Sequence, residues 1–190
     1  MNFATKLEEQ IRKVISGWDD AGIYAISFLL TADESSVYDG VHNFPEFSVG
    51  YNTEADCNEA EPMDEERWNY AYWSQNNVVL IDAIHHDMAN ALLQWYADQG
   101  ITDVGTESEG EMYDEDFNYI GKGPRGYWEL LSLISDIARK LQAEGFIKER
   151  FGNIPILVHD LDYSWYTAKM TENANPGGEA KVFLEYMSDM

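Results

Sequence analysis

An apolar run of eight residues from Ile23 to Leu30, IYAISFLL, constrains the fold more than any other feature of this sequence. The run is rich in residues that favour strands and is too short for a helix of normal length, so it predicts a central strand. Phe47, Val49 and Tyr51 alternate with small or polar residues, which is typical of a half-buried strand. We therefore expect the two segments to pair as a hairpin.

The rest of the chain contains helical and strand-like segments without a regular strand–helix–strand alternation. Apolar residues recur at helical spacing in four segments: 3–16, 84–95, the stretch that Pro124 opens, and 180–187. Residues 154–161 and 163–170 favour strands, whereas 68–73 fits either a strand or a short helix. This order predicts one α+β domain over residues 1–190, with an antiparallel sheet of about four to five strands and helices packed mainly on one face.

The formal charge of −23 at pH 7 is concentrated in one continuous stretch of the chain. Between Val14 and Gly121 there are 23 acidic residues and a single basic residue, Arg67, which gives a net charge of −22. Seven carboxylates cluster at 54–66 and seven more at 103–116. Such a surface repels phosphate backbones and anionic lipids, so we expect no direct nucleic-acid partner and no membrane partner.

The cellular compartment is indicated by features that the sequence lacks. No apolar run approaches the roughly 20 residues that a membrane-spanning helix needs. The N-terminal residues mix charges into an amphipathic pattern, whereas a secretory signal has a basic head and an unbroken apolar stretch. Cys57 is the only cysteine, so no disulfide can form within the chain. We therefore expect a cytoplasmic protein.

The succession of IYAISFLLTAD, FSVGYNTEAD and ERWNYAYW resembles the bacterial family catalogued as domain of unknown function 4303. The resemblance covers most of the chain in the order of its elements. Its most specific parts are residues 24–30, residues 51–54, and Arg67 and Trp68 with Trp73. None of these motifs is catalytic in form. The resemblance implies a small bacterial protein of the kind encoded beside polymorphic toxins, where such proteins are candidate immunity proteins.

Two pairs of side chains fit metal or acid–base chemistry. Asp82 and His86 are four residues apart, so on a helix they would share a face and could hold a metal ion. Asp160 and Asp162 would project to the same side of a strand and could form a carboxylate pair. Neither pair belongs to a recognised motif, and a helix cap or an exposed turn explains each equally well. We therefore expect no catalytic residue and no cofactor.

Four aromatic residues, Trp68, Tyr70, Tyr72 and Trp73, stand close together in the sequence. They could line a deep pocket for a small molecule or a peptide. Aromatic runs at strand or helix period more often belong to a core, and we assign most of these residues to packing.

The leading hypothesis is a non-catalytic protein whose acidic face captures a basic protein partner, such as a toxin encoded nearby. Charge of one sign accelerates encounter with a partner of the other sign. The rivals are a metal-dependent hydrolase that uses the Asp82 or the Asp160 pair, and an aromatic-lined binder. The sequence does not indicate an oligomeric state. The residues expected to contact the partner are Glu61, Asp64, Glu65, Glu66, Glu107, Glu109, Glu111, Asp114, Glu115 and Asp116.

Overall fold

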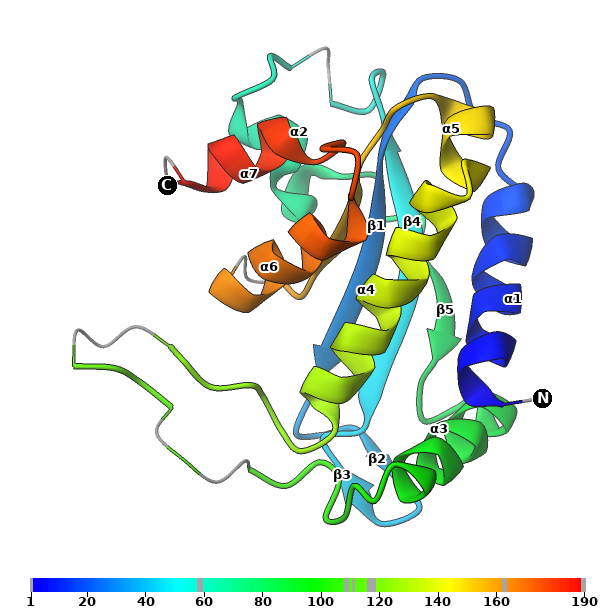
Figure 1. The fold of residues 1–190 in the computed structure, drawn as a ribbon, viewed down its shortest axis with the longest axis vertical. Coiled ribbons are helices and arrows are strands. Elements are labelled where there is room, and N and C mark those ends of the chain that lie inside the picture. Colours follow the sequence, from blue (N-terminus) through cyan, green and yellow to red (C-terminus); the bar gives the residue numbers. More distant parts are fainter. Residues whose placement is uncertain are drawn as a thin grey trace.

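The computed structural model describes residues 2–57, 60–107, 110, 112–115, 119–161 and 164–188. Figure 1 shows a central sheet with helices around it, so the α+β fold predicted from the sequence is confirmed. The elements are α1 (Phe3–Ser16), β1 (Ile23–Ala32), β2 (Val37–Tyr38), β3 (Val41–His42), β4 (Pro45–Thr53), α2 (Glu65–Trp68), the 3-10 helix η1 (Tyr70–Tyr72), β5 (Val78–Ile81), α3 (His86–Asp98), α4 (Tyr127–Ala143), α5 (Phe146–Phe151), β6 (Ile156–His159), α6 (Trp165–Ala174) and α7 (Lys181–Ser188).

The main sheet has four strands in the order β5-β4-β1-β6, and β2 and β3 form a separate ribbon. β1 pairs antiparallel with β4, with Phe28 opposite Val49, as the hydrophobic pattern predicts. On its other side β1 pairs with β6 in parallel, with Phe28 opposite Val158. The pair is parallel because α4 carries the chain back to the end of the sheet at which β1 begins (Figure 1). The sheet is therefore mixed.

The two faces of the sheet bury different side chains, because neighbouring residues of a strand point to opposite faces. Ile26 and Phe28 belong to the larger core, to which α1, α3 and α4 contribute. Helix α1 joins this core through apolar residues at every fourth position from Phe3 to Ile15. Leu157 of β6 and Ala25 of β1 belong to a second, smaller core, which contains residues of α2, η1 and α7. Tyr24 joins this core as well, because the register of β1 is irregular between Ile23 and Ala25. This second core positions the candidate site.

The outer edge of β6 is sealed by polar side chains of α6 and of its C-cap residue. Asn175 accepts a hydrogen bond from the N–H of Ile156 at 2.9 Å and donates one to its carbonyl at 2.8 Å. The hydroxyl of Thr171 accepts from the N–H of Val158 at 2.9 Å and donates to its carbonyl at 3.1 Å. These bonds satisfy backbone groups that an edge strand otherwise leaves unpaired.

The strand expected at 163–170 is wrong, because helix α6 occupies most of that segment. Ser164 precedes the helix, and its N–H donates to the Thr167 hydroxyl at 2.9 Å as part of a capping box. Met170 and Ala174 are buried one turn apart, which is a helical spacing. Residue 163 itself lies outside the described residues.

The open choice at 68–73 is settled in favour of helical structure, because α2 ends at Trp68 and η1 follows it. Strand β5, helix α5 and the β2–β3 ribbon were not predicted, and each of these elements is six residues long or shorter. The helices expected at 3–16 and 84–95 are confirmed as α1 and α3. Across the residues that the structure describes, every helix is too short or too polar to cross a membrane.

Replacing Thr171 with valine tests the seal on β6 while keeping the shape of the side chain. The two backbone groups of Val158 then lose their partner in the interior, so the free energy of unfolding falls by about 2 kcal/mol. Urea denaturation measures this loss. Thr5→Val, at an exposed position of α1, changes the free energy of unfolding by less than about 0.5 kcal/mol. Equal losses in the two variants would contradict the role given to Thr171.

Candidate functional site

The first acidic segment leaves the sheet at the end of β4 and leads into α2. Glu61, Asp64, Glu65 and Glu66 are all exposed to solvent. The Asp64 carboxylate accepts a hydrogen bond from the backbone N–H of Glu61 at 2.8 Å, and Glu65 accepts one from the side chain of Asn69 at 2.8 Å. Within the part of the chain that the structure describes, none of the four carboxylates forms an ion pair.

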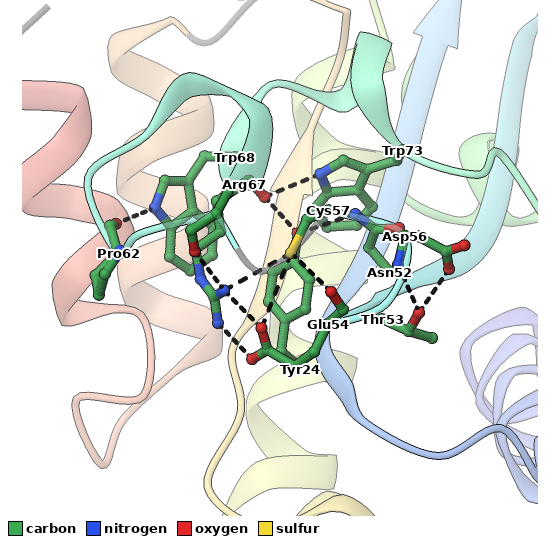
Figure 2. A network of polar contacts seen from close by, with 11 residues as sticks. Tyr24, Asn52, Thr53, Glu54, Asp56, Cys57, Pro62, Arg67, Trp68 and Trp73 are labelled. Atoms are coloured by element: carbon green, nitrogen blue, oxygen red, sulfur yellow. Dashed lines mark hydrogen bonds and ion pairs between the residues drawn. The ribbon is translucent and has the colours of Figure 1, made fainter.

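Arg67 fastens this segment to the sheet, as Figure 2 shows. Its guanidinium donates two hydrogen bonds to the Glu54 carboxylate, at 2.7 and 2.8 Å, and one to the carbonyl of Ala60 at 3.2 Å. It also lies over the ring of Tyr24 in β1, with 4.1 Å between Cζ and the ring centroid. The backbone carbonyl of Arg67 accepts hydrogen bonds from the Tyr24 hydroxyl at 2.5 Å and from the indole N–H of Trp73 at 3.1 Å.

The ion pair with Glu54 uses Arg67, which is the single basic residue between Val14 and Gly121. Hydrogen bonding to Glu54 raises the pKa of Arg67, and the same bonds lower the pKa of Glu54. The positive charge of Arg67 is therefore matched by Glu54 and does not offset the carboxylates around α2. Their negative charge stays at the surface, where it can attract a cationic partner.

The sequence-predicted aromatic platform is divided between the interior and the surface. Trp68 and Trp73 are only 4% and 5% exposed, and both pack edge-on against Tyr24. The indole N–H of Trp68 donates to the carbonyl of Pro62 at 2.7 Å, which holds the loop above it (Figure 2). Both tryptophans belong to the second core, where their rings pack against other side chains instead of lining the deep pocket that the aromatic-binder hypothesis requires.

Two large side chains beside the carboxylates are exposed instead. Met63 is 44% and Tyr72 is 53% exposed. Trp68 of α2 packs against Phe183 of α7, so the two helices are neighbours. Burial raises the pKa of Tyr186 on α7, and the charges of Glu65 and Glu66 raise it further. We call this region the α2 surface, defined by Glu61, Met63, Asp64, Glu65, Glu66 and Tyr72. The sequence reasoning missed Met63 and placed Tyr72 among the packing candidates.

The second acidic segment starts at the opposite end of the sheet. Thr53, which precedes the first segment, pairs with Ile23 at the start of β1. The second segment leads instead into α4, whose Tyr127 hydroxyl donates to the carbonyl of Leu30 near the end of β1 at 2.8 Å. Leu30 lies seven residues after Ile23 along the strand, a distance of roughly 23 Å. The described parts of the two acidic clusters therefore belong to two surfaces and do not form one face.

Backbone contacts fix the base of the second segment. Gly105 donates its N–H to the carbonyl of Arg125 at 2.9 Å, and Arg125 donates to the carbonyl of Thr106 at 2.9 Å. A side chain at position 105 would clash, because a Cβ atom there would lie 1.7 Å from the carbonyl oxygen of His42. Of the partner-contact candidates in this segment, Glu107 and Glu115 are exposed, Asp114 is half-buried, and Glu109, Glu111 and Asp116 lie outside the described residues.

Asp82 and His86 do not share a helix face, because α3 begins only at His86. The Asp82 carboxylate accepts hydrogen bonds from the N–H groups of Ile84 and His85, at 2.7 and 2.5 Å, and lies 2.9 Å from the His85 ring. The ring of His86 packs against Tyr38 instead. Asp82 thus orders the turn before the helix, and no group of three or more potential ligands is found in the described chain.

Of the Asp160–Asp162 pair, residue 162 lies outside the described residues. Asp160 follows the end of β6, and its carboxylate accepts a hydrogen bond from the hydroxyl of Tyr166. Asp82 and Asp160 follow strands on opposite edges of the sheet, three strand spacings or roughly 14 Å apart. Asp82 and Asp160 therefore do not converge on one cleft.

His159 is buried between β1 and the second core. Its Nδ1 lies 2.7 Å from the carbonyl oxygen of Asp160, and its Nε2 lies 2.7 Å from Oγ of Ser27. A carbonyl only accepts, so Nδ1 carries the proton and Nε2 accepts from the serine hydroxyl. Such a pair resembles an activated nucleophile, but Ser27 is fully buried and no substrate reaches it. Burial lowers the pKa of His159 to about 4, which keeps the ring neutral.

Comparisons of this chain with protein-family models, with curated proteins and with solved structures give no match. The resemblance to the domain of unknown function 4303 family stays a prediction. The function is therefore inferred from the geometry of the α2 surface.

The buried His159 makes stability depend on pH. Its pKa is lower in the folded chain than in the unfolded one, so the unfolded chain takes up protons first and stability falls as the pH drops below about 6.5. Between pH 7.5 and 5 this histidine removes about 2 kcal/mol from the free energy of unfolding. His159→Gln abolishes that part of the loss in denaturant titrations at the two pH values. The exposed control His42→Gln retains that loss. If His159→Gln leaves the pH dependence of the free energy of unfolding unchanged, His159 is not its source.

We call the paired hydrogen bonds between Arg67 and Glu54 the Arg67–Glu54 clasp. Replacing Arg67 with methionine tests whether this clasp holds the acidic segment against the sheet. Glu54 loses its partner, so the free energy of unfolding falls by about 2 kcal/mol, and the amides of residues 60–68 exchange faster with solvent. Hydrogen exchange and urea denaturation measure the two effects. Arg139→Met, an exposed change on α4, alters stability by less than about 0.5 kcal/mol. Exchange at 60–68 that is the same in wild type and Arg67→Met would argue against the clasp.

Proposed function

We propose that this chain is a non-catalytic binding protein that captures a basic protein partner through the α2 surface. The observation that carries the proposal is the combination of two exposed large side chains, Met63 and Tyr72, with four exposed carboxylates that form no ion pair with any described residue. Protein interfaces commonly combine aromatic or methionine anchors with a charged rim. A partner with lysine and arginine around an apolar patch complements such a surface.

The scaffold beneath the α2 surface is ordered before any partner arrives. Arg67 is bonded to Glu54 and Ala60, and Trp68 is buried against Tyr24 and Phe183. A surface that is already ordered loses little conformational entropy on binding, which favours high affinity. Carboxylates that have no internal cation partner also keep their full attraction for an approaching cation.

The partner class that best fits these properties is a toxin, with this chain as its immunity protein. Toxins that act on nucleic acids present basic surfaces, and fast electrostatic capture is what an antidote requires. The resemblance described from the sequence points to the same class. The proposal rests on the α2 surface alone and does not require the second acidic segment, whose described base is at the other end of the sheet.

A matched pair of charge variants tests the proposal against the purified product of the neighbouring gene. Changing Glu61, Glu65 and Glu66 to Gln, and Asp64 to Asn, lowers the association rate at least about tenfold at low salt. The control changes four exposed acids elsewhere to Gln, namely Glu9, Glu129, Glu149 and Glu172. Stopped-flow kinetics at low and high ionic strength measures the rates, because salt screens the attraction.

Tyr72→Ala, in the same assay, separates the apolar contact of Tyr72 with the bound partner from the electrostatic attraction that speeds association. It raises the dissociation rate at least about tenfold and leaves the association rate nearly unchanged. Equal effects of the two charge variants, or binding that is indifferent to salt, would contradict the electrostatic mechanism. Absence of binding to the neighbouring product would contradict the toxin partner.

A further inference from the structure

A groove of about 820 Å³ lies between α1 and β5, away from the α2 surface. One wall is a stripe of α1 that runs from Lys6 to Gly17, and the opposite wall is β5. The start of α3 lines it as well, through residues 85–88. Its volume falls in the range of ligand-binding clefts, which is roughly 300 to 1,000 Å³. In Figure 1 these elements lie on the opposite side of the molecule from α2 and α7.

The groove exposes the backbone of β5. Val78, Val79 and Leu80 are consecutive, and all three line it. Successive strand residues point to opposite faces, so a hollow that touches three in a row runs along the edge of the strand. β5 pairs only with β4, and within the described chain its other edge makes no backbone hydrogen bond. Val78 is 41% exposed at this edge.

The two edge strands of the sheet, β6 and β5, differ in whether side chains hydrogen-bond to their outer backbone groups. The edge of β6 is closed by Asn175 and Thr171, whose side chains bond the strand's own N–H and carbonyl groups. No equivalent side-chain bonds reach β5 on its groove side among the described residues, although proteins usually protect an exposed edge. An open edge beside a groove is the geometry that accepts an added strand.

The chemistry of the groove differs from that of the rest of the surface. Lys6 and Lys13 contribute two cations from α1 against one lining acid, Asp87, and the ring of His85 is already engaged by the Asp82 carboxylate at 2.9 Å. The Lys6 ammonium donates to the backbone carbonyl of Asp87 at 3.0 Å, so it is held at the rim. In a chain of net charge −23 this groove is locally basic and apolar, and it complements a ligand with carboxylates and aliphatic side chains.

We propose that this groove binds an extended acidic peptide segment of another protein, which adds as a fifth strand to β5. The stripe of α1 from Lys6 to Gly17 is about 16 Å long. That length accommodates about five residues of extended chain. Alternate side chains of the added strand face α1, so its carboxylates lie against Lys6 and Lys13 while its valine-like side chains point to the other face of the sheet. This site is independent of the proposed function.

The test uses a fluorescently labelled hexapeptide of alternating aspartate and valine, measured by anisotropy at physiological salt. At that salt, charges more than about 8 Å away are largely screened, so the repulsion from the rest of the chain is small. The peptide binds, and the amides of Val78 to Leu80 become protected from hydrogen exchange. A version with methylated backbone nitrogens binds at least about tenfold more weakly, because it cannot extend the sheet.

Lys13→Glu reverses one exposed cation of the groove and weakens binding about fivefold. Lys148→Glu makes the same change at an exposed position of α5 and changes affinity less than about twofold. The charge variant of the α2 surface binds the peptide like wild type, which separates this site from the proposed function. No binding at about 1 mM peptide, or equal loss in the two lysine variants, overturns the proposal. Self-association that protects β5 while the peptide fails to bind also overturns it and assigns the edge to a second copy.

Discussion

β1 is paired on both edges, and Ile23 to Phe28 are buried without interruption. The larger core packs on one of its faces and the second core on the other, so every layer of the molecule meets at this strand. Tyr24 connects β1 to the α2 region, because its ring packs against Trp68 and Trp73 and lies under the guanidinium of Arg67. The acidic α2 surface is thus attached to the centre of the sheet rather than to a peripheral loop.

Local sequence patterns predict this fold where one periodicity dominates, as in the apolar run of β1 and the every-fourth spacing of α1. They fail where a short run fits two periods. Residues 163–170 suit a strand by composition, and the capping contact between Ser164 and Thr167 is what commits the chain to a helix. The parallel direction of β6 depends on the path through α4 and α5, and no local pattern encodes that path.

In the candidate site, too, some features follow from the local sequence and others do not. Exposure of the acids at 61–66 follows from their chemistry, because carboxylates are rarely buried without a partner. The separation of Tyr72 from its aromatic neighbours does not follow from composition. In a 3-10 helix, residues three apart share a side, so Tyr70 and Trp73 face the core while Tyr72 points elsewhere. The distance between the two acidic clusters is set by the length of β1, which only the paired structure reveals.

The clasp made by Arg67 and Glu54 has a consequence for how such a chain can change over generations. The residues that keep the segment folded are Arg67, Glu54 and Trp68, whereas the side chains of Glu61 and Glu66 make no hydrogen bond that the described fold uses. Substitutions at those two positions therefore have little effect on stability, and in the proposed interface they would alter which partner is bound. Under the proposed function, folding and recognition depend on different side chains, so recognition would be free to diversify while the scaffold is inherited unchanged.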